Sequence, residues 1–506
     1  MATPSEKLTE SLGALRAIQQ GGATTIRSGD LSRTHRERLL ENGFLQEVMK
    51  GWYVPARPDE QAGESTAWYA SFWGFCAAYL GDRFKQNWCL SPEQSLLIHA
   101  GNWTVPRQLL VRAPKGGNKP TGLPHGTSIF DVRASLPEAG QAETINGLNV
   151  FSLPTALVQI GSGMFRANST EVRAVLAMVH DESEILSILL NGGHSVIAGR
   201  LAGAFRNIGR EKVAGGILDG MKSAGYKVSE ADPFEEPSSI LFTVREASPY
   251  VTRMRLDWQA MRSDIIDAFP KSPPAAVDID AYMKHVEDVY VTDAYHSLSI
   301  EGYQVSEELI RRVRDRTWNP DGEEDREHRN ALAARGYHDA FQVVKDSVKK
   351  VLNGAGAGET AEADHGKWYR ELFSPSVTAG ILQPGDLAGY RNGPVYIRQS
   401  MHTPPAREAV RDLMPAFFNL LRVEENAAVR VVLGHFMFVF IHPYIDGNGR
   451  VGRFLMNVMM ASGGYPWTVI TVDSRDAYMA ALEQASVQKD IKLLAEFLAG
   501  FLAANQ

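Results

Sequence analysis

The sequence is poor in cysteine, with only Cys76 and Cys89 among 506 residues. Their spacing does not match a metal-binding pair, and two cysteines are too few for a disulfide scaffold, so the composition favours a reducing compartment. Residues 1–10 also lack the apolar core of a secretory signal peptide. We therefore expect a cytoplasmic protein.

Long apolar runs are lacking as well. Residues 65–81 form an uncharged, largely apolar run, but it is shorter than the ~20 residues that cross a bilayer and contains Ser71 and Gly74. We expect it to form a buried helix and expect no membrane partner. Positive charge is not in excess either, because the formal net charge is −7. This argues against a general nucleic-acid coat but leaves a local basic face open.

One stretch, residues 442–453, is written HPYIDGNGRVGR and carries most of the chemistry. Residues 427–441 before it are almost wholly apolar, which is typical of a buried helix, and Pro443 ends that helix. After it, apolar residues recur at helical spacing, which predicts a second helix from about Gly449. The stretch is therefore expected to be a glycine loop between two helices.

The loop has the composition of an anion site. Gly447 and Gly449 flank Asn448 and let main-chain N–H groups turn inward, while the following helix adds its positive end. Arg450 and Arg453 are three residues apart on one helix face and can bind successive phosphates. The sequence therefore predicts a phosphate site.

Two residues of the loop could do more than bind phosphate. Asp446 is a carboxylate among neutral and positive groups, which suits a ligand of Mg²⁺ that bridges phosphate oxygens. His442 can take the proton from an attacking hydroxyl near neutral pH. Separately, these residues could be a helix cap, a turn and a solvated face, but their combination in one stretch favours the functional interpretation.

The stretch resembles the signature of the Fic family, His-x-Phe-x-Asp/Glu-Gly-Asn-Gly-Arg-x-x-Arg. The one departure is Tyr444, where the family usually has the Phe that anchors the loop in the core. The resemblance covers residues 240–506 and implies an all-α Fic domain with a β-hairpin flap.

The resemblance implies a protein adenylyltransferase that carries out AMPylation. His442 would deprotonate a Ser, Thr or Tyr hydroxyl of a protein, or of the chain itself, and this hydroxyl would attack the α-phosphorus of ATP. Mg²⁺ would be held by Asp446, and the phosphates by Gly447, Asn448, Gly449, Arg450 and Arg453. The intact Gly-Asn-Gly disfavours the kinase-like branch of the family. UTP or another donor stays open, as does removal of AMP by the same site.

A second motif lies upstream. Ser297, Glu301 and Gly302 end a predicted helix, residues 278–301, and match the family's inhibitory motif, Ser/Thr-x-x-x-Glu-Gly/Asn. In such a role Glu301 would pair in a bidentate way with Arg453 and misalign the ATP phosphates, so the enzyme would be autoinhibited. The simpler interpretation is a glutamate near a helix end followed by a stop glycine.

Residues 389–391 followed by 395–398, and then 401–405, read as a short hairpin with a turn near Asn392 and Gly393. They resemble the family's flap, whose edge would hold a target segment by strand addition through Val395, Tyr396 and Ile397. A hairpin without a target role is the alternative.

Residues 1–60 are predicted to be a winged helix-turn-helix, with a helix at 8–20, a short helix and turn at 24–31, a helix at 33–42 and a hairpin at 44–55. The resemblance here is to AbiE-type antitoxins as far as about Tyr226, on residues 38–44, 51–54, 91–99 and 151–157. If this domain binds DNA, the contacts would come from Arg33, Arg36, Arg38 and Lys50. A protein-interaction module is the alternative.

The length allows roughly two to four domains. We predict a multidomain chain: the winged helix at 1–60, an α/β middle domain at 61–228, an acidic, proline-containing linker at 229–239 and the Fic domain at 240–506. The alternative function is an antitoxin-like, DNA-binding regulator whose Fic domain senses nucleotide. Assembly into a homo-oligomer stays open.

Overall fold

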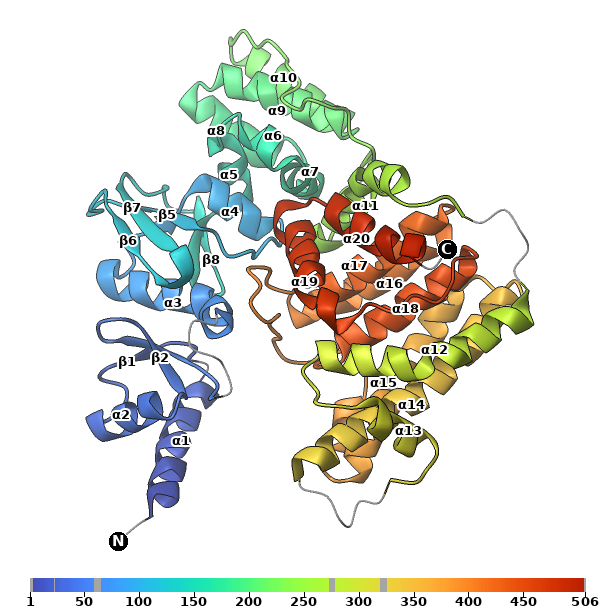
Figure 1. Ribbon diagram of the computed structural model, residues 1–506. Helices are drawn as coiled ribbons and strands as arrows, with labels where there is room; N and C mark the ends of the chain where they lie inside the picture. Colours follow the sequence, from blue (N-terminus) through green and yellow to red (C-terminus); the bar gives the residue numbers. More distant parts are fainter. Residues whose placement is uncertain (1–2, 22, 59–64, 273–277, 319–324, 505–506) are drawn as a thin grey trace. The chain divides into compact units, whose positions relative to one another are not determined.

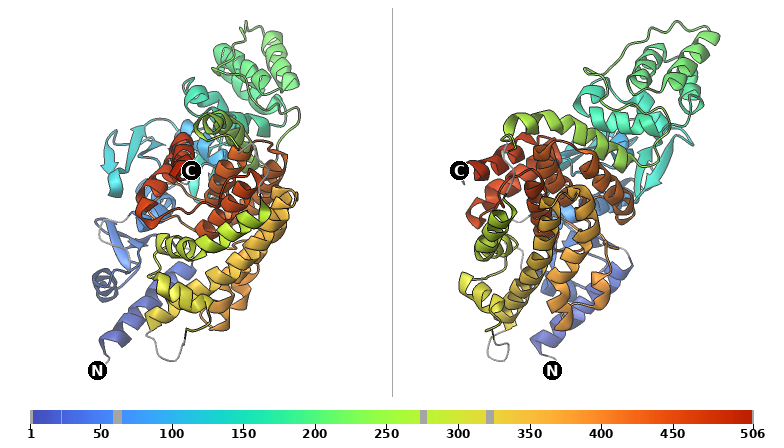
Figure 2. Two further views of the ribbon diagram at one scale, coloured as in Figure 1. Left: turned by 45° about the vertical axis from the view of Figure 1, so that its right-hand side comes forward. Right: turned by 90° about the vertical axis from the view of Figure 1, so that its right-hand side faces the viewer.

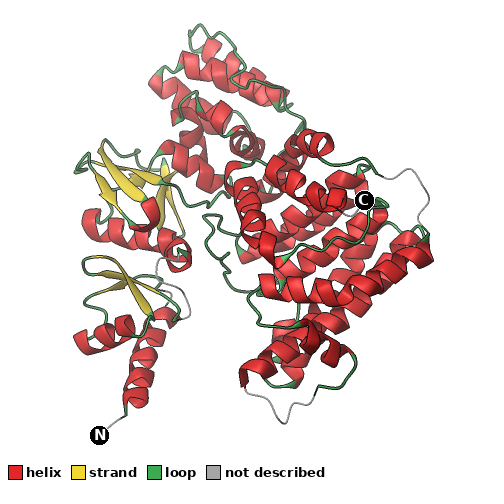
Figure 3. Ribbon diagram, viewed as in Figure 1, coloured by secondary structure: helices red, strands yellow, loops and turns green. Residues whose placement is uncertain are grey.

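The computed structural model describes residues 3–21, 23–58, 65–272, 278–318 and 325–504 (Figure 1). The chain folds into two compact units: unit 1 is Met1–Arg253 with Tyr396–Thr403, and unit 2 is Met254–Val395 with Pro404–Gln506. All the described strands lie in unit 1, and the described part of unit 2 is helical (Figure 3). The predicted border at residues 60 and 61 lies outside the described residues.

The first part of unit 1 has two helices and a three-stranded sheet of order β1-β3-β2. The elements are α1 (Pro4–Gln20), β1 (Ile26–Arg27), α2 (Arg33–Glu41), β2 (Leu45–Met49) and β3 (Trp52–Pro55). The predicted hairpin is confirmed, because β2 and β3 pair antiparallel. The predicted helix at 24–31 is wrong. The structure therefore does not confirm a winged helix-turn-helix.

Strand β1 replaces that helix for a local reason and a tertiary one. Thr24, Thr25 and Ile26 are β-branched in succession, which favours extended backbone. The chain then turns at Asp30, whose carboxylate accepts the Arg27 main-chain N–H at 2.7 Å. Ile26 is fully buried and pairs with Tyr53 of β3, a contact that a helix could not make.

The middle of unit 1 is built on a mixed sheet of order β4-β5-β7-β6, in which β5 and β7 are parallel, and on the hairpin β8-β9. The predicted buried helix at 65–81 is confirmed as α3, whose Trp68, Phe72 and Phe75 are fully buried in the core. The elements are α3 (Thr66–Phe84), β4 (Cys89–Leu90), α4 (Pro92–His99), β5 (Gln108–Ala113), β6 (Pro120–Gly122), η1 (Pro124–Gly126), β7 (Ser128–Arg133), β8 (Ala142–Ile145) and β9 (Leu148–Phe151).

Helices complete this unit: α5 (Leu153–Gln159), α6 (Met164–Ala167), α7 (Ser169–Met178), α8 (Ser183–Gly192), α9 (Ser195–Asn207) and α10 (Glu211–Ser223). The predicted linker, residues 229–239, has no helix or strand, but it lies against α7 and α9. Phe234 is buried beneath Arg173, 4.2 Å from the guanidinium, and Asn207 donates to Asp232 at 2.8 Å. Residues 229–239 are thus packed against helices of unit 1.

Unit 2 contains the remaining helices, and α11 begins just before it. They are α11 (Pro249–Ala268), α12 (Ile279–Ile300), α13 (Glu307–Arg314), α14 (Asp325–Leu352), α15 (Ala357–Thr378), η3 (Pro384–Leu387), α16 (Arg407–Val423), α17 (Ala427–Ile441), α18 (Asn448–Ser462), η4 (Val472–Ser474), α19 (Arg475–Glu483), η5 (Gln484–Gln488) and α20 (Lys492–Ala504).

The core of unit 2 is the pair α17 and α18, which pack closely against each other. Most residues of both helices are buried, as the apolar sequence on either side of the loop predicts. Helices α14 and α15 pack on α18, and α12 lies along α14 (Figure 2). The site is therefore built where the most buried helices of this unit end and begin. None of the described helices is both long and apolar enough to span a membrane.

Candidate active site between α17 and α18

His442 lies directly after α17, in the left-handed conformation with φ 53° and ψ 60°. Its Nδ1 is 3.1 Å from the carbonyl oxygen of Val439. Because a carbonyl can only accept, Nδ1 carries the proton and Nε2 is left as the basic nitrogen. Burial lowers the pKa of His442 to about 4, so the ring is neutral at pH 7. This is the form that a general base requires.

The glycine loop behaves largely as predicted. Gly447 has φ 76°, and α18 begins at Asn448, one residue before the predicted start. The Asn448 side chain accepts from the Tyr444 N–H and donates to the Tyr444 carbonyl, both at 2.8 Å. Its amide therefore shapes the loop. The first-turn N–H groups of α18 have no acceptor within the helix, which leaves them for an anion.

Tyr444 anchors the loop, as the family's phenylalanine would. Its ring stacks on Tyr369 with centroids 3.9 Å apart and planes 4° from parallel, and the side chain is 1% exposed. The departure from the family pattern therefore leaves the loop packed in the core.

Arg450 is buried between aromatic rings. Its guanidinium lies 5.3 Å from the Tyr303 ring centre and 5.0 Å from that of Phe373. A guanidinium terminal nitrogen is 3.5 Å from Asp446 Oδ1. Cation–π contacts thus hold the positive charge under the loop, with the Asp446 carboxylate at ion-pair distance. Neither ring was identified from the sequence, because Tyr303 and Phe373 are far from Arg450 along the chain and no local pattern connects them.

Arg453 is paired with the upstream motif. Its Nε donates to Ser297 Oγ at 2.9 Å, and one terminal nitrogen donates to Glu301 Oε1 at 2.7 Å and to the Ser297 carbonyl at 3.0 Å. The pairing of Glu301 with Arg453 is confirmed. The bidentate geometry predicted for this pair is wrong. Only one guanidinium nitrogen binds Glu301, and Nε donates to Ser297 instead.

Glu301 occupies the position expected for an anion at the start of α18. A Cβ atom on Gly449 would lie 2.3 Å from Glu301 Oε1, so the carboxylate reaches the first turn only because residue 449 is glycine. Burial acts to raise the pKa of Glu301, but Arg453 and Arg450 outweigh it and lower that pKa. For Arg453, burial acts to lower the pKa, and Glu301 outweighs it, so the net pKa is raised. Gly302, at φ 87°, follows the end of α12.

Asp446 is the acidic residue of the loop that a metal could reach. Its side chain is 60% exposed, and its Oδ1 accepts the Gly447 N–H at 2.6 Å. The described residues contain no cluster of three or more His, Cys, Asp or Glu side chains able to hold a metal. One exposed carboxylate beside a phosphate site still fits Mg²⁺, which keeps most of its ligands as water and phosphate oxygens.

The predicted flap hairpin is wrong, because no strand forms in residues 389–403. Pro394 cannot donate to a strand ladder, and the chain has a different set of partners. Val395 belongs to unit 2, whereas Tyr396 and Ile397 belong to unit 1. Within unit 1, Gln399 N–H donates to Thr66 Oγ1 at 3.0 Å, and the Met401 carbonyl accepts from Val105 N–H at 2.9 Å.

The predicted DNA contacts lie on α2 and on the turn after β2. Arg33 pairs with Glu37 at 2.7 Å, and Arg36 donates to the Ser28 carbonyl. Arg38 donates to the Lys7 carbonyl and to Ser11 Oγ, at 2.7 and 2.8 Å. Lys50 lies on the turn between β2 and β3. DNA binding stays a prediction, and three of its four cations already have partners inside the protein.

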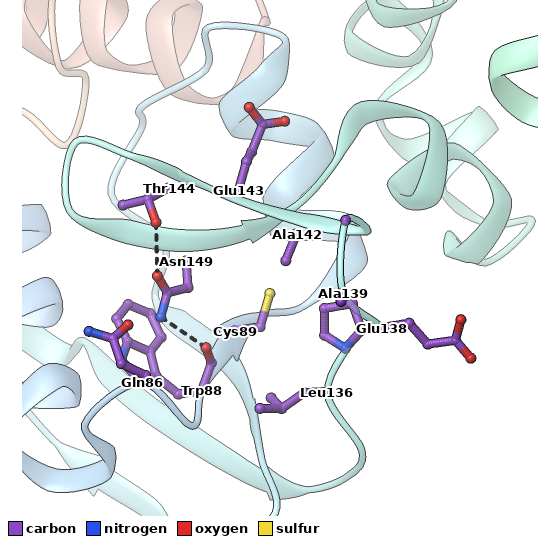
Figure 4. Close-up of a pocket in the computed structure, with 12 residues that line it drawn as sticks. Gln86, Trp88, Cys89, Leu136, Glu138, Ala139, Ala142, Glu143, Thr144 and Asn149 are labelled. Atoms are coloured by element: carbon purple, nitrogen blue, oxygen red, sulfur yellow. Dashed lines mark hydrogen bonds between the residues drawn. The ribbon is translucent and has the colours of Figure 1, made fainter.

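A separate hollow of about 290 Å³ lies in unit 1, under the hairpin β8-β9. Figure 4 shows Asn149 on its wall, held by Thr144 Oγ1 and by the Trp88 carbonyl. Burial raises the pKa of Cys89 to about 12, so its thiol stays protonated. Cys89 therefore supplies no thiolate nucleophile to the hollow.

A model of the Fic/DOC family matches residues 363–460. These residues are a Fic/DOC family domain. The predicted recognition is thereby confirmed for this part of the chain, which spans most of α15, all of α16 and α17 and most of α18. The resemblance of the amino-terminal part to AbiE-type antitoxins stays a prediction.

The Fic domain has curated relatives. The chain is 29% identical over 224 residues to "Protein adenylyltransferase Fic" of Drosophila virilis, covering 44% of this chain and 41% of the relative. It is 27% identical over 218 residues to the protein of that name from Nematostella vectensis, covering 42% and 47%. The matches thus span less than half the length of either relative.

A solved structure, Fic-1 (aa134–508) from C. elegans, is 18% identical and aligns with a TM-score of 0.37, covering 67% of this chain and 94% of that one.

Proposed function

We propose that the protein is an adenylyltransferase that moves AMP from ATP to a Ser, Thr or Tyr hydroxyl of a protein, either a target or its own chain. The observation that carries the proposal is the state of His442, a neutral histidine whose Nδ1 binds the Val439 carbonyl and whose Nε2 has no hydrogen-bond partner among the described residues. It lies at one end of the loop whose other end is the first turn of α18. The names of the curated relatives support the same reaction.

In the proposed reaction, His442 Nε2 accepts the proton of the target hydroxyl as its oxygen bonds to the α-phosphorus of ATP. The bond between that phosphorus and the bridging oxygen breaks, and pyrophosphate leaves with the electron pair. Arg450 and the first-turn N–H groups of α18 hold the outer phosphates. Asp446 would hold Mg²⁺, which neutralises phosphate charge when it is bound.

We further propose that Glu301 inhibits this reaction. Its carboxylate binds Arg453 and lies against Gly449, so it occupies both the cation and the helix end that an outer phosphate would use. Nucleotide bound beside it would have its phosphates displaced. The α-phosphorus would then be out of line with the attacking hydroxyl, and catalysis of phosphoryl-type transfer depends mainly on that alignment.

The test is transfer from labelled ATP by the full-length Glu301→Gly variant. We expect label to be incorporated at least about tenfold faster than by the parent, because one charged contact of about 1.4 kcal/mol corresponds to a factor of ten. His442→Ala in the same background should abolish incorporation. Glu307→Gln is the matched control, since this exposed carboxylate pairs with Arg311 and not with Arg453.

Mass spectrometry of the labelled protein then identifies the modified residue and the mass of the group added. An added mass other than that of AMP would show that the transferred group is not AMP, and the proposed reaction would have to be replaced. Equal incorporation by Glu301→Gly and by the parent would remove the inhibitory role, and incorporation that survives His442→Ala would remove the proposed base.

A further inference from the structure

Arg391 lies in the segment between η3 and α16, 51 residues before His442, and it is 3% exposed. Its side chain binds main-chain oxygens only. Nε donates to the His442 carbonyl at 2.7 Å, one terminal nitrogen donates to the Gly393 carbonyl at 3.1 Å, and the other donates to the carbonyls of Pro405 and Ile441 at 2.5 and 3.5 Å.

The main chain of the same residue adds a further contact, because its N–H donates to the Pro443 carbonyl at 2.9 Å. Arg391 thus binds three successive carbonyls, those of Ile441, His442 and Pro443, at the end of α17. Carbonyls at a helix C-terminus lack partners within the helix and lie at the negative end of its dipole. A buried guanidinium is suited to cap them.

No carboxylate among the described side chains forms an ion pair with this guanidinium. Burial lowers the pKa of Arg391 to about 10, with Glu408 acting in the opposite direction. A buried cation without an ion-pair partner is costly, and it is kept here by carbonyl oxygens alone. The position of the guanidinium therefore depends on the conformation of residues 441–443. That conformation depends in turn on the guanidinium.

We propose that Arg391 is a positioning residue for His442, which holds the histidine main chain in its left-handed conformation so that Nε2 faces the reacting hydroxyl. Two contacts then fix the histidine from opposite ends: Arg391 holds its carbonyl, and the Val439 carbonyl holds Nδ1. Without the first contact, the backbone of His442 is free to leave a region that residues other than glycine rarely adopt. The inference rests on the proposed function only for the task of His442 as base.

The test compares Arg391→Lys with Arg411→Lys, both in the full-length Glu301→Gly background. A lysine keeps the charge but cannot direct donors to carbonyls on three sides. Arg411 is the matched control because it also holds this segment, donating to Asn392 Oδ1 at 2.6 Å, but from the exposed side. We expect Arg391→Lys to lower kcat about 100-fold, as a displacement of about 1 Å does, with KM for ATP nearly unchanged. Arg411→Lys should change neither.

A second readout needs no substrate. Full-length protein labelled with ¹⁵N in histidine rings is compared by NMR, with His442→Gln used to assign the signals. In the parent, His442 should show the form protonated on Nδ1, and Arg391→Lys should shift or broaden these signals. Identical His442 signals in the two proteins would overturn the proposal. Failure of the Glu301→Gly parent to transfer AMP would instead reject the proposed function, and the ring signals would still decide the role of Arg391.

Rescue gives the third readout. Arg391→Ala leaves a space of guanidinium shape, so guanidinium chloride at a concentration that leaves the melting temperature unchanged should restore part of kcat, whereas sodium chloride should not. Absence of rescue in a variant that is folded overturns the proposal.

Discussion

At the residue scale, Ser297 has a role that the motif alone does not define. Its hydroxyl accepts from Arg453 Nε, and its carbonyl accepts from a terminal nitrogen of the same guanidinium. Ser297 therefore orients the guanidinium of Arg453 toward Glu301. Glu301 itself accepts a single hydrogen bond from that guanidinium. If Glu301 inhibits transfer as proposed, the serine would help to hold the inhibited state together with the glutamate.

Ser297→Ala should raise basal AMP transfer about fivefold, which corresponds to the roughly 1 kcal/mol that a hydrogen bond contributes. The increase should be smaller than that of Glu301→Gly, because the salt bridge and the Ser297 carbonyl contact remain. The measurement is the initial rate with labelled ATP. Ser299→Ala, on the same turn of α12, is the control and should match the parent. A rate for Ser297→Ala equal to that of the control would show that the serine does not support inhibition.

At the element scale, α17 and α18 are joined by a buried histidine as well as by apolar packing. His435 is fully buried, with Nδ1 2.9 Å from the Gly452 carbonyl of α18 and Nε2 2.7 Å from the hydroxyl of Tyr478 in α19. The carbonyl requires the proton on Nδ1, so Nε2 accepts from the tyrosine. Burial lowers the pKa of His435 to about 4.

This pKa gives a stability prediction with a definite sign. Between about pH 6.5 and pH 4, the unfolded histidine is protonated and the folded one is not, so the unfolded state binds more protons. The free energy of unfolding should therefore fall as the pH falls through this window, with His435 contributing about 1.4 kcal/mol per pH unit. Urea unfolding of the parent and of His435→Leu across this range isolates the contribution. A pH slope equal in the two proteins would contradict it.

At the scale of the whole molecule, the segment that follows the Fic domain's predicted flap turn is assigned to the amino-terminal unit. Residues 396–403 pack within that unit, where Met401 contacts its aromatic core and Ser400 and His402 are buried. Two of the three residues predicted to hold a target, Tyr396 and Ile397, therefore belong to the amino-terminal unit. This gives that unit a connection to the Fic domain through the chain itself, whether or not it binds DNA.

Met401→Asp should release this segment, because a carboxylate cannot be buried in that core without a partner. We expect trypsin to cleave after Arg398 about tenfold faster or more in this variant of the full-length chain, since cleavage requires local opening. Peptide mass spectrometry measures the rate. Tyr396→Ser, which changes a side chain that is 43% exposed, is the control and should leave the rate unchanged.

Much of the site could be predicted from the sequence because its parts are contiguous. His442, Asp446, Gly447 and Arg450 follow one another along the chain, so the ends of two helices place them together whatever surrounds them. The apolar character of both helices predicts their burial for the same local reason. Glu301 was found through its motif, and the structure adds how it reaches Arg453.

Other features were decided only by the tertiary structure. Ile26 takes part in a strand because Tyr53 pairs with it, and the predicted flap has no strand because its residues bind Thr66 and Val105 instead. Arg391 acquires its role from carbonyls that meet only after folding. The sequence by itself determined the chemistry of the loop, since that chemistry depends on neighbouring residues. Folding decided what holds the loop in position, because a main-chain oxygen is the same at every residue and carries no signal in the sequence.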